Sequence, residues 1–385
     1  MATKNKSVLD THNIVTADEL KDILKTMLDA IDRDPSVVTT MPPLWIWGSP
    51  GCGKSTIVRT LCEERGIEFI DTRLSQMESC DIRGLPVPNH ELHQMDWYVN
   101  GSWPRSPKGK GIIFLDELSS CDRSCAVAAY ELVLDRRLGK LYQVPPGYLI
   151  VAAGNLTTDR AIAMSTSSAL ANRFMHVELK EDAEAWLKWA RANNVHPAII
   201  GFITYKPNML FNMEGENLER GWPSPRAWER VSQMCHIYAN GSSESLLRKM
   251  VYGLVGNGTG VEFMEFYKIN AEFKNVLDIM KDPNSKIEIP ERADQKYALC
   301  SSMVYLLWRG KDAEDENRRI NGFYRICMAL TSDFASMALL AAMQGKDKAE
   351  VKDHCGKLLR HKLFSEWKKK HGEAIHKHLD LSKLF

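Results

Sequence analysis

Five short apolar segments alternate with amphipathic stretches between residues 44 and 179, and this alternation restricts the fold more than any other feature of the chain. Several of these segments are apolar at successive positions, as expected of strands that are buried on both faces. Such strands, alternating with helical patterns, predict a parallel sheet with crossover helices on both of its faces. The predicted strands are Leu44–Trp47, Glu68–Ile70, Ile112–Leu115, Tyr148–Ala152 and Met175–Leu179.

Helical patterns flank this α/β segment on both sides. Thr16 and Glu19 have the spacing of a capping box, and apolar residues at helical spacing predict a helix over residues 17–32. No strand pattern follows residue 181. We therefore predict four segments, namely an N-terminal helix and linker (1–40), an α/β domain (41–180), a helical lid (181–267) and a C-terminal helical extension (268–385).

The composition is that of a globular protein, with 44% apolar and 26% charged residues. Lys and Arg number 50 against 49 Asp and Glu, so the net charge of +1 gives no overall basic character of the kind that marks nucleic-acid-binding proteins. No apolar run approaches the ~20 residues of a membrane span, and the N-terminus lacks the apolar core of a signal peptide. The nine cysteines follow no disulfide-framework spacing. We expect a cytoplasmic protein with reduced thiols.

The first predicted strand leads into a glycine-rich sequence. Residues 48–55 read GSPGCGKS, which fits G-x-x-x-x-G-K-[ST] without a mismatch, and a helical pattern follows directly. Glycines let backbone N–H groups surround phosphate oxygens at the positive end of a helix. Lys54 is then predicted to reach the β- and γ-phosphates of ATP, and Ser55 to bind Mg²⁺. The candidate ATP-binding residues are Gly48, Ser49, Pro50, Gly51, Cys52, Gly53, Lys54, Ser55 and Thr56.

Asp116 and Glu117 end the third predicted strand. Ligands of open α/β sheets bind at the carboxyl ends of the strands, so these carboxylates are expected near the phosphate-binding loop. Two acids after a strand more often mark the start of a helix, but their pairing with the loop favours a functional role. Asp116 is predicted to hold Mg²⁺, and Glu117 to polarise an attacking water. A base in this place predicts hydrolysis rather than phosphoryl transfer to a metabolite.

Three further positions gain meaning from their order along the chain. Asn155 ends the fourth predicted strand, Arg173 lies just before the fifth, and Arg226 opens a helix beyond the sheet. An amide such as Asn155 can bind water or the γ-phosphate without adding charge. Taken singly, each position is better explained as a capping asparagine or a solvated arginine.

Together, these motifs resemble those of the AAA+ ATPases. Three segments resemble the MoxR-type branch of that family: LSQMESCDIRGLP (74–86), ALANRF (169–174) and WPSPRAWERVS (222–232). The resemblance covers about residues 40–265. It implies a P-loop AAA+ fold of class α/β, in which a five-stranded parallel sheet with helices on both faces is followed by a helical lid, and here by a helical extension.

The resemblance also implies roles for the candidate residues. Lys54 and Ser55 correspond to Walker A, and Asp116 and Glu117 to Walker B. Asn155 corresponds to sensor 1, Arg173 to an arginine finger offered to the neighbouring subunit, and Arg226 to the sensor 2 arginine. The cofactors would be ATP and Mg²⁺, with Ser55 and Asp116 as the metal ligands.

The family relationship further implies a homo-oligomeric ring, usually a hexamer, that remodels protein partners as a chaperone does. Many relatives act with a partner that carries a von Willebrand A-like domain, whereas the N-terminal helix and the long tail of this chain depart from the shortest members. Two alternatives stay open. A nucleic-acid motor or clamp loader is disfavoured by the net charge of +1, and a nucleotide-gated assembly scaffold is disfavoured by the presence of Glu117, Asn155 and Arg173 together.

Two excursions from the α/β pattern carry further expectations. Residues 76–109 hold Trp97, Tyr98, Trp103 and Arg105 in a connection that is long for a compact domain. Its aromatic side chains either grip a substrate chain or pack locally against loop prolines. Residues 137–147 predict a hairpin directly before the fourth strand.

Overall fold

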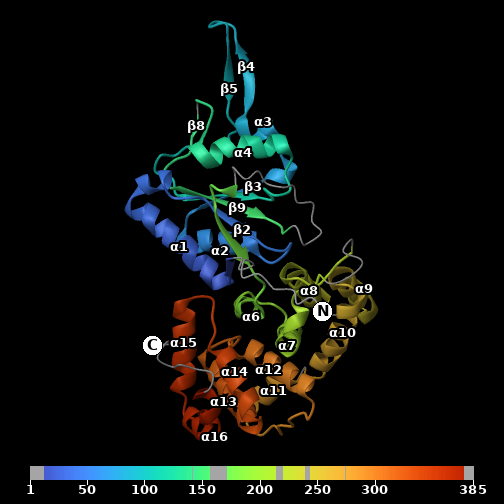
Figure 1. Cartoon of the computed structure of the whole chain (residues 1–385). Coiled ribbons are helices and arrows are strands. Elements are labelled where there is room, and N and C mark those ends of the chain that lie inside the picture. Colours follow the sequence, from blue (N-terminus) through green and yellow to red (C-terminus); the bar gives the residue numbers. More distant parts are fainter. Residues whose placement is uncertain are drawn as a thin grey trace, which may run out of the picture. The chain divides into compact units, whose positions relative to one another are not determined.

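The computed structural model describes residues 13–140, 142–156, 171–213, 220–238, 243–273 and 275–376. The chain divides into two compact units, Met1–Asp182 and Ala183–Phe385. Each unit is described by itself (Figure 1).

A six-stranded, entirely parallel sheet forms the centre of the first unit. The strand order is β1-β10-β2-β9-β6-β3, so the strand that leads into the glycine-rich loop lies between β10 and β9. The strands are β1 (Ile14–Val15), β2 (Leu44–Trp47), β3 (Glu68–Arg73), β6 (Gly111–Asp116), β9 (Tyr148–Gly154) and β10 (Met175–Leu179).

All five predicted strands are confirmed, and the expected strand count of five is corrected to six. The additional strand, β1, lies at the edge of the sheet and pairs with β10, through Ile14 opposite Glu178 and Val15 opposite Leu179. A strand of two residues is too short to show a period of two in the sequence.

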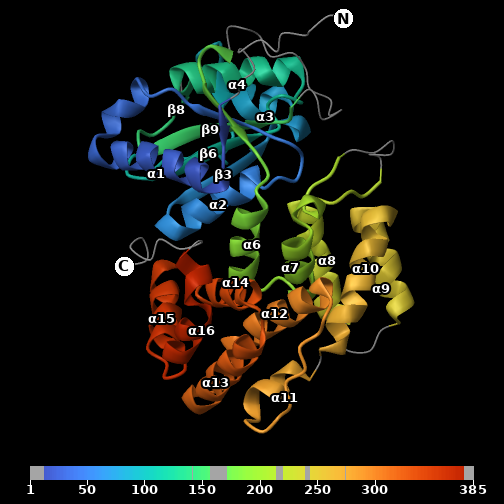
Figure 2. The ribbon, with the colours of Figure 1, turned by 60° about the horizontal axis from the view of Figure 1, so that its bottom comes forward.

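Helices cover both faces of this sheet, as predicted (Figure 2). Ile112 and Phe114 of β6 pack in a core shared with α1 (Ala17–Arg33) and α2 (Lys54–Arg65). Ile113 and Leu115 pack on the other face, in a core shared with α3 (Ser79–Arg83) and α4 (Arg123–Asp135). Side chains of a strand alternate between its faces, so burial on both sides requires the continuous apolar runs seen in the sequence.

The predicted N-terminal helix is confirmed as α1, and its capping box is formed. Thr16 Oγ1 accepts a hydrogen bond from the Glu19 backbone N–H at 3.3 Å, and the Thr16 N–H donates to Glu19 Oε2 at 2.8 Å. These two bonds satisfy groups that would otherwise lack partners at the start of the helix.

The 76–109 connection contains an antiparallel hairpin of β4 (Leu85–Asn89) and β5 (Gln94–Tyr98), which extends beyond α3 and α4 in Figure 1. Its aromatic residues differ in burial, and the predicted grip on a substrate chain stays a prediction. Trp103 is buried and its Nε1 donates to the Ile82 carbonyl at 3.0 Å, whereas Trp97 and Tyr98 on β5 are exposed. The predicted second hairpin is also confirmed, as β7 (Arg137–Leu138) and β8 (Tyr142–Gln143).

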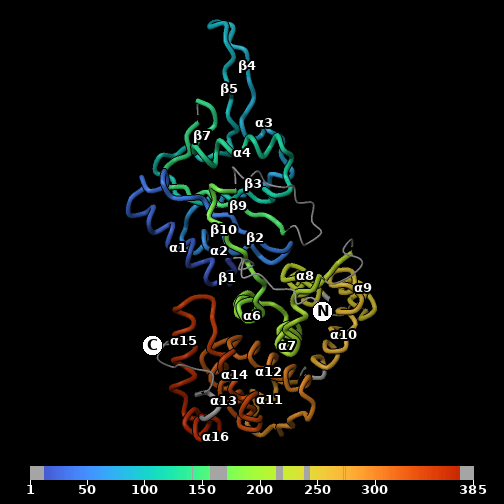
Figure 3. Tube along the Cα trace, viewed as in Figure 1, coloured from blue at the N-terminus to red at the C-terminus, as the bar shows by residue number. Residues whose placement is uncertain are grey.

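Every regular element in the described part of the second unit is helical (Figure 3). One core joins α6 to α10, and a second joins α11 to α16. The helices are α6 (Ala183–Ala192), α7 (Pro197–Tyr205), α8 (Pro225–Tyr238), α9 (Glu244–Val255), α10 (Asn257–Glu272), α11 (Val276–Lys281), α12 (Ala293–Leu307), α13 (Ala313–Ala329), α14 (Ser332–Ala342), α15 (Lys348–Leu359) and α16 (Phe364–His376).

The two cores of the second unit are continuous through α12, which packs along α7. The predicted division between a lid (181–267) and an extension (268–385) falls within α10 and stays a prediction. No helix in the described part of the chain is both long enough and apolar enough to cross a membrane.

Candidate functional site

The glycine-rich loop connects the end of β2 to the start of α2. All nine candidate ATP-binding residues lie in this loop or in the first three positions of α2. Gly53, directly before the helix, has φ 103°, a conformation that favours glycine, and no side chain caps the helix there. The first N–H groups of α2 are therefore left for a bound anion such as a phosphate. A Cβ at Gly48 would lie only 2.9 Å from the carbonyl oxygen of Leu179 in β10.

The Lys54 ammonium joins this loop to the end of β9. Lys54 is buried, and its Nζ donates to the carbonyl oxygens of Gly48 at 2.6 Å and Ser49 at 3.2 Å. The same Nζ donates to Asn155 Oδ1 at 3.2 Å, 101 positions further along the chain. The structure thus brings together the lysine of the loop and the asparagine that follows the fourth predicted strand.

Asp116 and Glu117 lie at the carboxyl end of β6, one strand further across the sheet from β9. The Glu117 N–H donates to Asp116 Oδ1 at 2.9 Å, and Glu117 has φ 60°. A non-glycine residue in this region stores backbone strain, which often marks functional sites. Burial raises the pKa of Asp116 and the charge of Lys54 opposes this rise, so the lysine and the carboxylate act on each other electrostatically.

The two predicted Mg²⁺ ligands, Ser55 and Asp116, both carry oxygen donors. Hard oxygen ligands, here the Asp116 carboxylate and the Ser55 hydroxyl at the start of α2, are those that Mg²⁺ prefers. The neighbouring carboxylates of Glu117 and Asp71 further raise the pKa of Asp116. A divalent cation would offset this excess of negative charge.

Two serines of the site were not identified from the sequence. Ser75 Oγ donates to Glu117 Oε2, and Ser119 Oγ accepts from the Asn155 N–H at 3.0 Å. Ser75 follows β3, whose carboxyl end lies beside that of β6. Polar residues at strand ends gather along one end of a parallel sheet, but the predicted strand ended at Ile70, five positions before Ser75, so this signal was missed.

Arg173 lies at the amino-terminal ends of the strands, whereas the glycine-rich loop lies at their carboxyl ends. It precedes β10, whose first residue, Met175, is paired with Leu44 at the start of β2. Arg173 lines a cavity of about 390 Å³ together with Leu149, at the start of β9, whereas Asn155 follows the end of that strand. Asn155 lies six positions beyond Leu149 along the strand, which at ~3.3 Å per position is about 20 Å.

Arg226 belongs to the second unit, as the second residue of α8. Ser224 Oγ accepts from the Ala227 N–H at 3.2 Å, so the Pro-Ser-Pro-Arg sequence caps the start of this helix. The relation of Arg226 to the glycine-rich loop stays a prediction.

Comparison with known proteins finds a family match in the central part of the first unit. Residues 44–177 match the ATPase family associated with various cellular activities (AAA). The denitrification regulatory protein NirQ of Stutzerimonas stutzeri is 26% identical over 120 residues. That alignment spans 29% of this chain and 42% of NirQ.

Two solved structures resemble the chain at low scores. A protein from Cytophaga hutchinsonii assigned as an ATPase has a TM-score of 0.33 and 14% identity, covering 76% of this chain and 81% of its own. The RuvB Holliday junction branch migration motor of Thermotoga maritima has a TM-score of 0.34 and 15% identity, covering 76% and 87%.

Strands β2, β3, β6 and β9 and the glycine-rich loop all lie within the segment that matches the family. Residues 44–177 thus combine a parallel α/β sheet and a glycine-rich loop with a match to the model of the AAA ATPase family.

Proposed function

We propose that this chain is a MoxR-type AAA+ ATPase that hydrolyses ATP with Mg²⁺ in a homo-oligomeric ring, a hexamer, and uses the energy to remodel a protein partner. The observation that carries this proposal is the contact between Lys54 Nζ and Asn155 Oδ1. Asp116 lies close enough for the charge of Lys54 to oppose the rise that burial causes in its pKa. A phosphate-binding lysine, a polar amide and an acidic pair thereby meet at the carboxyl edge of one sheet.

Each residue has a role that its position supports. Lys54, now held by loop carbonyls, would turn to the β- and γ-phosphates, where a charge-assisted bond is stronger than its present neutral ones. Ser55 and Asp116 would hold Mg²⁺. Glu117 would accept the proton of the attacking water, and for this its carboxylate would leave the hydrogen bond with Ser75.

Arg173 is proposed to act on the ATP of a neighbouring subunit. The amino and carboxyl ends of strand β9 are about 20 Å apart. An arginine side chain at the amino end is too short to reach the glycine-rich loop of its own subunit. An arginine supplied from another subunit stabilises charge on the transferring phosphoryl group and is worth ~10³–10⁵ in kcat. This arrangement requires an assembly of copies, which supports a ring. Arg226 is proposed as the sensor 2 arginine on the resemblance alone.

The β4–β5 hairpin favours a protein partner over nucleic acid. Residues 85–98 read LPVPNHELHQMDWY, with two acidic residues and no Lys or Arg. Leu92, Met95 and Tyr98 are between 55% and 69% exposed. Phosphate backbones are bound by Lys and Arg, whereas exposed apolar side chains on a projecting element suit a protein surface. A partner with a von Willebrand A-like domain is proposed from the resemblance.

A Glu117→Gln variant tests the proposed function. The amide keeps the shape of the side chain but accepts no proton, so ATP should bind normally while hydrolysis falls at least about a hundredfold. The trapped variant, incubated with ATP, should retain a protein partner through affinity purification. Glu63→Gln, an exposed change at the far end of α2, is the matched control and should behave as the wild type.

Two outcomes would contradict the proposal. Turnover of Glu117→Gln near the wild-type rate would remove the base assignment. Retention of nucleic acid instead of protein, released by moderate salt, would favour the nucleic-acid motor.

A further inference from the structure

A cavity of about 250 Å³ lies among α6, α7, α12, α14 and α15 within the second unit. One wall is apolar and includes the ring of Trp308, which two contacts hold in place. Its Nε1 donates to the Ala342 carbonyl at 2.9 Å, and the ring stacks on His354 with centroids 4.0 Å apart. Cavities of about 150 Å³ hold benzene, so this one has room for a larger ring. Further apolar lining residues include Val304, Met337, Ala338 and Ala341.

The lining also carries a positive charge that no carboxylate neutralises among the described residues. Arg191, in the last turn of α6, donates from Nη1 to Gln344 Oε1 at 2.9 Å. Its Nε is fully buried and has no hydrogen-bond partner among the described residues. No ion pair joins Arg191 to an acidic residue within that part of the chain either. Burial alone lowers the pKa of Arg191, to about 10. A buried cation without a counter-charge costs stability.

The remaining charged groups add to this excess. Arg309 and Lys346 also line the cavity, against one acidic lining residue, Glu350. Glu350 already has another partner, because its Oε2 accepts from the Lys346 backbone N–H at 2.5 Å at the start of α15. Arg309 is held against the ring of Tyr305, 3.9 Å from its centroid. The lining therefore combines an apolar wall with three cationic side chains and one engaged carboxylate.

We propose that this cavity binds a small ligand that carries an anionic oxygen group, a carboxylate or a phosphate, on an apolar ring. The anionic group lies at the Arg191 guanidinium, which it supplies with the missing counter-charge. The ring lies against Trp308 and the apolar side chains of α12 and α14. The site is separate from the proposed ATP chemistry and does not depend on it.

Calorimetric titration of the full chain with 2-naphthoate and 2-naphthamide tests the proposal. The two probes share a ring, and only the first is charged. Naphthoate should bind at least about tenfold more tightly, the scale of one charge-assisted bond. Titration with 2-naphthyl phosphate, in a Lys54→Ala background that removes the loop lysine, then distinguishes phosphate from carboxylate. Ala341→Leu, which fills the cavity, should weaken both naphthoate and naphthamide.

Variants of Arg191 locate the charge. Arg191→Met should lose the preference for naphthoate yet melt at the same or a higher temperature without ligand, because it removes an uncompensated buried charge. Arg191→Lys keeps the charge and should keep the preference. Arg248→Met, a change at a half-buried residue on α9 outside the cavity, is the control and should alter neither property.

Three results would overturn the proposal. The first is equal affinity of the wild type for naphthoate and naphthamide, and the second is no binding of either anionic probe at millimolar concentration. The third combines two observations: Arg191→Met melts at a lower temperature or fails to fold, and Arg191→Lys has no preference for naphthoate. Together these observations would make Arg191 a structural residue.

Discussion

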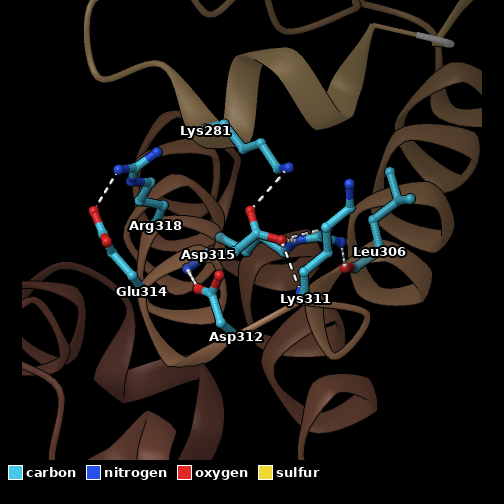
Figure 4. A network of polar contacts seen from close by, with 8 residues as sticks. Lys281, Leu306, Lys311, Asp312, Glu314, Asp315 and Arg318 are labelled. Atoms are coloured by element: carbon cyan, nitrogen blue, oxygen red, sulfur yellow. Dashed lines mark hydrogen bonds and ion pairs between the residues drawn. The ribbon is translucent and has the colours of Figure 1, made fainter.

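Removal of the buried Arg319 guanidinium should destabilise the second unit far more than removal of its exposed neighbour, Arg318. Arg319 is 4% exposed and donates to Asp315 Oδ2 from Nε at 3.1 Å and from Nη2 at 2.9 Å. Its Nη1 donates to the Leu306 carbonyl at 2.6 Å, which ties α13 to the end of α12. Lys281 completes the network through Asp315 Oδ1 at 2.8 Å (Figure 4).

The Arg319→Met substitution keeps the bulk of the side chain and deletes three donors. Hydrogen bonds to charged groups contribute ~1.5–3 kcal/mol each, but Asp315 keeps its bond to Lys281. A net loss of about 3 kcal/mol follows, in line with breaking one side of a buried ion pair. For a unit of about 200 residues this lowers Tm by about 6–12 °C.

The Arg318→Met substitution is the control. Arg318 lies one position earlier on the same helix and pairs with Glu314 at the same i,i+4 spacing, but its side chain is 58% exposed. Its loss should change stability by less than about 0.5 kcal/mol. Scanning calorimetry of both variants measures the difference. Equal shifts of the two melting transitions would refute the reasoning, because burial would then not set the strength of these pairs.

Three further outcomes are expected. Arg173→Ala should bind ATP but hydrolyse it very slowly, and Lys54→Ala should fail to bind ATP. Mixed rings of the two variants should recover some ATPase activity, because one supplies the intact ATP site and the other the arginine. Mixed rings that form but recover no activity would exclude action between subunits. Ser75→Ala frees the Glu117 carboxylate and should raise basal ATP hydrolysis without partner, measured as phosphate release, whereas an unchanged rate would make the contact incidental. Burial lowers the pKa of His196 to about 3, so between about pH 6.5 and 3 the unfolded chain binds a proton that the folded chain does not, and stability falls as pH drops. His196→Asn keeps a hydrogen-bond acceptor for the first turn of α7. In urea titrations, this variant should lose less unfolding free energy between pH 7 and pH 4 than the wild type. An equal loss in both proteins would mean that other groups cause the pH dependence.

Patterns among neighbouring residues predicted the strands, the first helix and the second hairpin. The five longer strands, the helix after Thr16 and the hairpin at 137–147 are all formed. The glycine-rich loop was predictable because its spacing is short and its flanking strand and helix are adjacent in the chain. The acidic pair and Asn155 were placed at the same sheet edge by the general rule for parallel strands.

Features that depend on distant partners were not predictable in this way. The edge strand β1 exists because Val15 meets Leu179 in β10. The contact from Ser75 to Glu117 spans 42 positions, and no periodicity indicates it. Helical patterns identified apolar faces in the second unit, but not that α12 would pack along α7. A period tells which face of a helix is buried, not which element covers it.

The placement of Arg173 and the glycine-rich loop at opposite ends of the strands of one sheet has a consequence for how activity scales with concentration. If each catalytic centre needs Arg173 from another copy, an isolated subunit has an ATP site that lacks this arginine. Dilution below the dissociation constant of the assembly would then silence the enzyme without unfolding it. The rate per subunit would rise with protein concentration until rings are saturated, and the cell could set ATP consumption through the abundance of the chain alone.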